Sequence, residues 1–431
     1  MAVQLDRREF LKRASVTGAV ALVGGITGFP SILRFRSAQA ANEVPVGSLL
    51  DQTGAINISG LPAIAGTKFA IKEINDNGGL LGKRLRLIQY DTQSEIAKYT
   101  LYVKKLILED EAVVIHAGIT SASREAIRPI IDEYQALYFY DNLYEGGVCD
   151  KYVFCTGQTP GQQMGPLAKY GLEKYGTKCY TIAADYNFGH ISWKWWEIYW
   201  RNGGDIISVP GAKLGAHVGK VEFIPLEVTD FNATIQRIQQ AKPDVLMTFL
   251  VGAAHVNFYR QFAAAGLHKK IPIISTNFGS GNEHIILGPR EVEGLVVCAA
   301  YLDDIDTPRN RAFKAAARKF TGDPKYLVGE QFSQKYTGWM MWAKAVQKAG
   351  SFDRVAVTQA MESGISMDAP HGRVKSEPKS HHLISDMHLA AVNDKHGWKI
   401  LEIYKDVLPT DTMKYCDLIA KPNQHTQYQP Q

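Results

Sequence analysis

DQTGAINISGLPAIAGTKFAIKEINDNGGLLGKRLRLIQYDTQ, residues 51–93, is the stretch that decides the fold. Apolar or small side chains recur at steps of three and four in its middle, at Ile64, Thr67, Ile71 and Ile74. This spacing predicts a helix with one buried face. Gly78 and Gly79 can take the left-handed conformation that ends a helix, and Leu85 and Leu87 then alternate as in a strand. The stretch therefore predicts a βαβ unit with a short polar loop where open α/β sheets bind ligands.

Short apolar runs alternate with helical patterns along the rest of the chain. Strands are predicted at residues 46–50, 84–90, 112–117, 136–140, 180–184, 205–209, 244–251, 271–275 and 294–300. Helical patterns lie between them, for example at residues 97–108, 123–134, 190–201 and 233–241. Short apolar strands separated by helices predict an α/β fold with doubly wound parallel sheets. Nine such strands suit two sheets better than one.

The first forty residues have the pattern of an export signal. Residues 6–12 read DRREFLK, a twin-arginine pattern, and a weakly apolar, glycine-interrupted run follows at residues 14–33. Residues 38–40, Ala-Gln-Ala, fit a small-x-small cleavage site. A cytoplasmic amphipathic terminus or a membrane anchor is the alternative, but an anchor needs a longer and more apolar run. We therefore expect residues 1–40 to be a twin-arginine signal peptide and the mature protein to be periplasmic.

Removing this leader changes the charge of the protein. The leader holds six basic and two acidic residues, which leaves 42 of the 48 basic and 41 of the 43 acidic residues in the mature chain. A net charge near +1 gives no reason to expect nucleic acid as a partner. The mature chain of about 391 residues is too long for one ordinary core and predicts two domains.

All five cysteines lie in the mature region. Cys149 and Cys155 are close in sequence and flank a turn, so in an oxidising compartment we expect them to form a disulfide. Cys179 and Cys298 lie in apolar strands and are predicted to be buried, and Cys416 has no evident partner. The sequence has no C-x-x-C and no H-E-x-x-H spacing, so no metal site is expected. Cofactor and nucleophile motifs, G-x-G-x-x-G and G-x-S-x-G, are also absent, and no cofactor is expected.

The phrase AIKEINDNGGLLGK at residues 70–83 resembles the opening of type I periplasmic solute-binding proteins. The Thr-Gly loop before it and the strand after it also fall at that family's spacing. The resemblance implies a protein that captures a small molecule between two α/β lobes joined by three crossings, closes by a hinge and docks on an inner-membrane ABC permease. It predicts a first lobe of residues 41–160 and 295–366 and a second lobe of residues 161–294 and 367–422. The Gln-rich tail, residues 423–431, is predicted to be disordered.

A Ser/Thr loop is the first candidate for the ligand site. Thr120 and Ser121 follow the strand at residues 112–117 and open a helix, whose free backbone N–H groups can bind a small polar ligand. Helix capping by Ser121 or Ser123 would explain the same residues without a ligand. The type I family holds its ligand at this loop, and the resemblance therefore favours a binding role.

Two aromatic loops complete the predicted site. Tyr140, Asn142 and Tyr144 follow the next strand, and rings combined with an amide suit a neutral polar ligand, although both rings could instead pack in the lobe. The segments around residues 144–163, 184–189 and 367–375 resemble the amide- and urea-binding branch of the family. That resemblance implies that Tyr186 and Phe188 close the site from the second lobe.

A third loop, residues 276–279, contributes Phe278 to the predicted site and lacks the carboxylate that amino-acid binders often place there. An unpaired buried ammonium is costly, which weakens the amino-acid interpretation unless Asp141 or Asp185 substitutes. Short amides or urea are therefore the first predicted ligands, and branched-chain or other amino acids the second. An exported cofactor-dependent enzyme and a sensor lobe that works with a separate signalling partner are the remaining alternatives.

Overall fold

The computed structural model describes residues 42–208 and 210–430. The predicted signal peptide lies outside the described residues. Within them, no helix is both long and apolar enough to cross a membrane.

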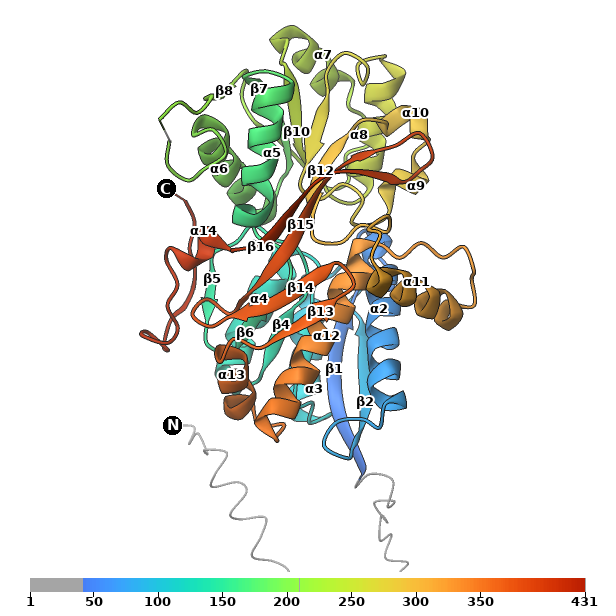
Figure 1. The fold of residues 1–431 in the computed structure, drawn as a ribbon, viewed down its shortest axis with the longest axis vertical. Helices are drawn as coiled ribbons and strands as arrows, with labels where there is room; N and C mark the ends of the chain where they lie inside the picture. The colour runs from blue at the N-terminus through green and yellow to red at the C-terminus, as the bar shows by residue number, and fades with distance from the viewer. Residues whose placement is uncertain (1–41, 209, 431) are drawn as a thin grey trace, which may run out of the picture. The chain divides into compact units, whose positions relative to one another are not determined.

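The first part of the chain builds a parallel sheet with the strand order β2-β1-β3-β4-β6 (Figure 1). Its strands are β1 (Glu43–Leu50), β2 (Arg84–Asp91), β3 (Ile115–Ala117), β4 (Tyr138–Tyr140) and β6 (Val153–Cys155). The helices around it are α2 (Asn57–Asp76), α3 (Ile96–Leu108), α4 (Ser121–Tyr134), α11 (Pro308–Thr321), α12 (Glu330–Ala349) and α13 (Arg354–Glu362). We call this sheet and the helices around it the first lobe. The βαβ prediction is confirmed, because α2 runs between β1 and β2, and Gly78 and Gly79 follow it with positive φ angles.

The second lobe is built in the same way on the strand order β12-β11-β10-β7-β8. Its strands are β7 (Lys178–Ala184), β8 (Ala216–His217), β9 (Glu222–Ile224), β10 (Val245–Phe249), β11 (Ile273–Ser275) and β12 (Val296–Ala299). Its helices are α5 (Pro160–Lys174), α6 (Asn187–Arg201), α7 (Asn232–Ala241), α8 (Ala253–Ala264), α9 (Glu283–Ile286) and α10 (Pro289–Val292). These strands pair in parallel, and β9 pairs with β7 as well.

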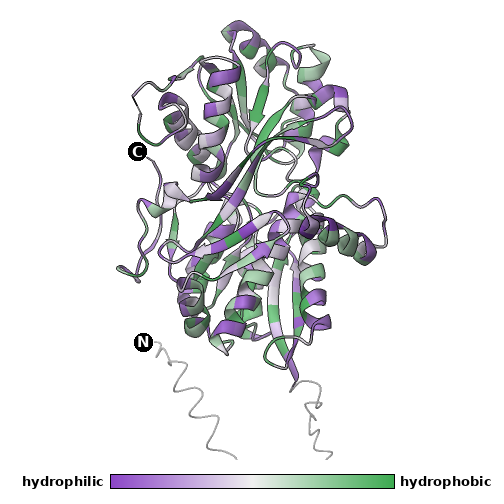
Figure 2. Ribbon diagram, in the orientation of Figure 1, coloured by the Kyte–Doolittle hydropathy of each residue, from purple (hydrophilic) through white to green (hydrophobic). Residues whose placement is uncertain are grey.

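Apolar side chains that alternate along the strands cover both faces of each sheet. In the first lobe, Val44 and Val46 pack with α2 and α12 on one face, and Leu49 packs with α3 and α4 on the other. In the second lobe, α7 and α8 cover one face, and α5 and α6 cover the other. Strands of both lobes are accordingly mostly hydrophobic in Figure 2, whereas the helices carry both colours. The predicted doubly wound α/β fold is confirmed.

A long antiparallel ribbon joins the two sheets into one of 15 strands. It consists of β15 (His382–Val392) and β16 (Trp398–Val407), which lie diagonally between the lobes in Figure 1. The start of β15 pairs with β6 and β14, and its end pairs with β12. The chain therefore passes between the lobes after β6, after β12 and along β15, and it returns along β16 beside β15. This makes one passage more than the three predicted.

Two segments lie in the other lobe from the one predicted. β12 belongs to residues 295–366, which are predicted for the first lobe, yet it pairs with β11 of the second. β13 (Ser366–Ala369) and β14 (Gly372–Glu377) lie almost wholly within residues 367–422, which are predicted for the second lobe, yet they pack with the first. A short apolar strand can extend either sheet, and only its hydrogen-bonded neighbours decide which one. The predicted strand at residues 205–209 is not formed over residues 205–208.

The C-terminal segment is ordered where the sequence predicts disorder. After α14 (Thr410–Met413), strand β17 (His425–Gln427) pairs antiparallel with β5 (Val148–Asp150) of the first lobe. Polar composition does not prevent order here, because backbone hydrogen bonds to β5 and a disulfide hold the segment in place.

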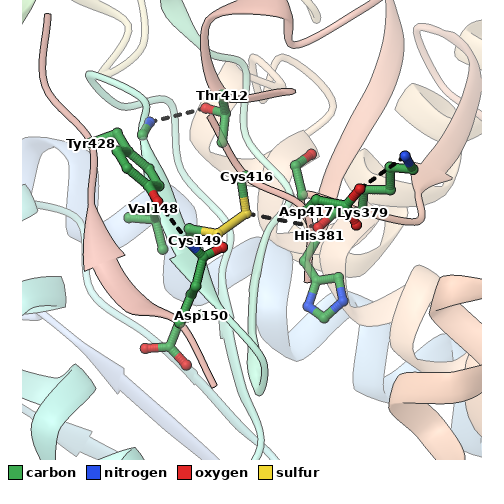
Figure 3. The surroundings of a disulfide bond; sticks show 12 residues. Val148, Cys149, Asp150, Lys379, His381, Thr412, Cys416, Asp417 and Tyr428 are labelled. Atoms are coloured by element: carbon green, nitrogen blue, oxygen red, sulfur yellow. Dashed lines mark hydrogen bonds and ion pairs between the residues drawn. A yellow bond between two sulfur atoms is a disulfide. The ribbon is translucent and has the colours of Figure 1, made fainter. Parts of the chain in front are cut away.

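That disulfide joins Cys149 to Cys416, and the predicted Cys149–Cys155 pair is wrong (Figure 3). Cys149 packs with Leu418 and Tyr428 of the C-terminal segment. Cys155 instead faces the helix-covered core of the first lobe, so closeness in sequence does not bring the two sulfurs together. Cys155 is a free buried thiol, like Cys179 and Cys298, and burial raises the pKa of Cys155 to about 12.

Candidate functional site

A cavity of about 40 Å³ lies between the two lobes. It is lined by Ser59, Ile119, Thr120, Ser121, Asn142, Leu143 and Gln331 from the first lobe, and by Tyr186, Phe188, Val251, Asn277 and Ser280 from the second. Apart from Ser59 and Gln331, these residues follow the carboxyl ends of β3, β4, β7, β10 and β11. Ligands of open α/β sheets bind at this edge, so the cavity is the candidate functional site.

The turn after β3 places the predicted Ser/Thr loop against the cavity. Gly118 has a φ of 82°, and a Cβ there would come within 3.0 Å of Ser123 Oγ, so the turn favours glycine. Thr120 caps α4, and its Oγ1 accepts a 3.2 Å hydrogen bond from the Ser123 backbone N–H. Ser121 Oγ donates to the Glu145 carboxylate. Thr120 therefore caps the helix and also lines the cavity. The hydroxyls of Thr120 and Ser121 are both held by hydrogen bonds to the protein.

Asn142 and Gln331 form the polar wall of the first lobe. Asn142 Nδ2 donates to the backbone carbonyl of Ile119, and Asn142 Oδ1 accepts a 2.7 Å hydrogen bond from Gln331 Nε2. Gln331 Oε1 is buried and has no hydrogen-bond partner within the described chain. A buried acceptor without a partner costs about 1–3 kcal/mol. This oxygen is therefore a group that a ligand N–H would satisfy.

Tyr186 and Phe188 form an aromatic wall on the second lobe. Both lie at the start of α6, directly after β7, with their ring centroids 6.0 Å apart. Burial raises the pKa of Tyr186 well above its ordinary value, so its phenol stays protonated and can donate a hydrogen bond.

The loop after β11 supplies Asn277 and Ser280. Asn277 Nδ2 donates to the backbone carbonyl of Leu250. The buried carboxylate of Glu283 accepts hydrogen bonds from the backbone N–H groups of Gly279, at 2.8 Å, and Gly281, at 3.1 Å. Glu283 thereby holds the loop in place from behind, without lining the cavity itself.

Three of the eight predicted site residues do not line the cavity. Tyr140 is buried in the first lobe, where its hydroxyl donates a 2.7 Å hydrogen bond to the Ile119 carbonyl. Tyr144 contacts His382 through its hydroxyl and accepts from the Val148 backbone N–H. Phe278 packs in the second lobe against Tyr259, with ring centroids 4.9 Å apart. For Tyr140 and Tyr144 the packing alternative describes the structure, and Phe278 likewise packs inside its lobe.

No formally charged side chain is among the described residues that line the cavity. A buried ion pair lies behind Ser121, where Arg124 Nη2 is 2.6 Å from Glu145 Oε1. Burial opposes the charge on Arg124, but the Glu145 and Glu125 carboxylates outweigh it and raise the Arg124 pKa. Glu145 is therefore already neutralised by an internal partner.

Sequence reasoning missed several lining residues as individual candidates, among them Ser59 and Gln331. Ser59 begins α2, inside the stretch that decides the fold. Gln331 lies on α12, a helix that is buried nearly throughout. The sequence signal that could have found Gln331 is a run of polar residues on a helix with apolar neighbours: Gln331, Ser333, Gln334 and Lys335. Buried polar groups need hydrogen-bond partners, so such a run indicates a polar site.

Comparison with known proteins identifies relatives of this chain. A family model described as periplasmic binding protein matches residues 43–397. A Leu/Ile/Val-binding protein homolog of Brucella melitensis biotype 1 is 21% identical over 361 residues, which cover 83% of this chain and 89% of the relative. The leucine-, isoleucine-, valine-, threonine-, and alanine-binding protein of Pseudomonas aeruginosa is 23% identical over 363 residues, covering 82% and 90%.

Solved structures share the fold. An ABC-transporter solute-binding protein of Rhodopseudomonas palustris, in complex with 3,4-dihydroxybenzoic acid, superposes with a TM-score of 0.75 at 20% identity, covering 86% of this chain and 99% of that one. The leucine-binding protein LivK of Thermotoga maritima gives a TM-score of 0.71 at 18% identity, covering 84% and 99%.

The fold is that of a type I solute-binding protein, the class that serves ABC transporters. This chain belongs to the periplasmic binding protein family. Family membership confirms the prediction of a binding protein rather than an enzyme, and it implies a periplasmic location.

Proposed function

We propose that this protein captures a short-chain amide or urea in the cavity between its lobes and delivers it to an inner-membrane ABC permease. The observation that carries the proposal is the uncharged lining of the cavity together with the unpartnered acceptor Gln331 Oε1. An amide or urea is neutral and offers N–H donors to such an oxygen. The Tyr186 hydroxyl can donate to its carbonyl, the oxygens of Thr120 and Ser121 can accept its N–H groups, and Phe188 covers the remaining face.

The charges of an amino acid would be harder to accommodate. A buried ammonium needs a carboxylate partner. Asp141 lies 2.6 Å from His116 and accepts from Thr156, and Asp185 pairs with His190 in an exposed position. Neither aspartate lines the cavity, and Glu145 is neutralised by Arg124. The two substitutes considered for the missing carboxylate are therefore engaged elsewhere.

Branched-chain amino acids are the second candidate. Ile119, Leu143 and Val251 give the cavity an apolar side that suits an aliphatic side chain. The relatives from Brucella and Pseudomonas are named for binding such amino acids. The structural neighbour bound to a dihydroxybenzoate adds an aromatic acid to the ligands that deserve testing.

Thermal unfolding against a ligand panel tests the proposal. The panel contains urea, formamide, acetamide, leucine, valine, glutamate and 4-hydroxybenzoate, with N,N-dimethylacetamide as the matched control that lacks N–H donors. A ligand at a hundred times its dissociation constant adds about 2.7 kcal/mol, which raises the midpoint by several degrees at roughly 2–4 °C per kcal/mol. We expect shifts with urea or acetamide and none with the dimethylated amide. Shifts with leucine or valine alone would overturn the proposed ligand class.

A further inference from the structure

Three side chains from distant parts of the chain converge beside the disulfide, on the first lobe. Asp132 lies in the last turn of α4, Asp150 ends β5 and His425 begins β17. His425 is the register partner of Asp150 in the β17–β5 pair, which places their side chains on the same side of the sheet. In Figure 3 Asp150 points away from the disulfide of the adjacent Cys149.

The ligand atoms of this cluster face one another at short distances. His425 Nδ1 lies 3.1 Å from Asp132 Oδ1 and 3.5 Å from Asp150 Oδ1. All three atoms lie within 4.8 Å of one another. Bonds of about 2.0–2.2 Å to a tetrahedral zinc ion separate its ligand atoms by about 3.3–3.6 Å, so both measured distances are close to one tetrahedral edge.

Two buried carboxylate oxygens in this cluster accept no hydrogen bond from the described residues and have only the His425 ring nitrogen beside them. The Asp150 side chain is buried, and its Oδ1 accepts no hydrogen bond from the described part of the chain. The same is true of Asp132 Oδ1. A buried oxygen without a partner, beside a second carboxylate, is a costly arrangement unless a cation or a shared proton relieves it.

The remaining charges do not neutralise the cluster. Arg128 Nε donates a 3.3 Å hydrogen bond to Asp150 Oδ2, the other oxygen of that carboxylate. The same guanidinium also pairs with Glu125, at 2.6 Å from Nη1. Arg128 is thus shared between Asp150 and Glu125 and contacts neither Oδ1 atom, so both Oδ1 atoms remain for a further positive group beside His425.

We propose that Asp132, Asp150 and His425 form a zinc site that fastens the C-terminal strand β17 to the first lobe. A mixed set of carboxylate and imidazole ligands suits zinc, whereas calcium takes oxygen ligands. His425 is partly exposed, so a water can complete the tetrahedron. No ligand spacing in the sequence indicates such a site, because its three ligands come from three separate segments.

Titration of the purified protein with zinc chloride by isothermal calorimetry, after treatment with a chelator, tests this proposal. We expect one equivalent of zinc to bind with micromolar or tighter affinity. His425→Ala and Asp132→Asn should each weaken binding at least tenfold. His190→Ala is the matched control, because His190 is also exposed and pairs with a single carboxylate, that of Asp185. This control should leave zinc affinity unchanged.

Two further measurements keep the test decisive. The first is the thermal midpoint of each variant without zinc, which shows whether the variant folds. The second is limited proteolysis, in which zinc should protect the C-terminal segment of the wild type but not that of His425→Ala. Absence of zinc binding by the wild type would overturn the proposal and assign the cluster to a shared proton. Equal zinc affinity of wild type and His425→Ala would also overturn it, as would a preference for calcium over zinc.

Discussion

Gln331 Nε2 donates a 2.7 Å hydrogen bond to Asn142 Oδ1 and thereby joins α12 to the loop after β4. Both polar atoms of the Asn142 amide are engaged by the protein, since its Nδ2 donates to the Ile119 carbonyl. This network fixes the orientation of the Gln331 amide, so the group presented without a partner is its Oε1 acceptor. The wall of the cavity is therefore organised before a ligand arrives.

Replacing Gln331 with methionine removes this acceptor at nearly constant volume. We expect a loss of about 1–3 kcal/mol in the binding of urea or acetamide, since a ligand N–H is then left unpaired. Calorimetric titration measures it, with Gln359→Met on an exposed face of α13 as the control. Unchanged affinity in Gln331→Met would show that the ligand is not held at Oε1.

Glu330 is predicted to make stability fall as pH rises. Burial raises the pKa of Glu330 to about 8 from 4.5, and nearby Glu283 adds to the shift. Between these two values the unfolded chain releases the proton and the folded chain keeps it, so unfolding becomes easier with rising pH, by up to about 1.4 kcal/mol per pH unit. Glu330→Gln stays neutral, and its thermal midpoint should fall less between pH 5 and pH 8. The exposed Glu133→Gln control should follow the wild type, and an unchanged slope in Glu330→Gln would contradict the prediction.

Removal of the Cys149–Cys416 disulfide should destabilise the protein by about 2–5 kcal/mol, because the bond closes a very long loop of the unfolded chain. Thiol labelling in denaturant, without reductant, identifies the pairing. The wild type should label at its three free cysteines, Cys155, Cys179 and Cys298. Cys416→Ser should add Cys149 to that set, and Cys155→Ser should remove one thiol from it. If Cys155→Ser instead labelled at one more thiol than the wild type, the result would support the Cys149–Cys155 pairing.

The buried pair of Arg124 and Glu145 should be costly to break from one side. Glu145→Leu leaves the Arg124 cation with Glu125 as its only carboxylate partner among the described ion pairs, and we expect a loss of about 3–5 kcal/mol. The double variant Arg124→Met, Glu145→Leu should recover much of the thermal midpoint, because no buried charge remains. Arg237→Met breaks the more exposed pair with Glu222 and should cost less than about 1 kcal/mol. Equal losses from Glu145→Leu and Arg237→Met would contradict this account.

Local pattern was sufficient for the fold but not for the assignment of strands to lobes. The helical spacing from Ile64 to Ile74 and the glycines after it predict α2 because side-chain period and glycine conformation act over a few residues. The sequence of β12 predicts a strand but not the sheet to which it belongs, because its pairing with β11 is decided by the tertiary structure. The same holds for Cys149, whose partner lies 267 residues away.

The candidate site was predictable where it follows strand ends. Thr120, Ser121, Asn142, Tyr186 and Phe188 line the cavity, and their role in binding a ligand stays a prediction. Tyr140, Tyr144 and Phe278 have the same residue chemistry but pack inside the lobes, because side-chain direction and available core space are not encoded in residue type. Gln331 reaches Asn142 from 189 residues away, and sequence spacing cannot reveal such a contact.

The ribbon of β15 and β16 has a mechanical consequence. Two antiparallel strands bonded along their length bend across their flat face but resist sliding past each other, because sliding would break every hydrogen bond between them at once. β16 ends beside the start of β15, and the Cys149–Cys416 bond fastens the segment that follows β16 to the first lobe, so this end of the ribbon is held in place. We expect the lobes to rock in one direction over a narrow angle. The rate of ligand exchange should then depend on the stiffness of the ribbon.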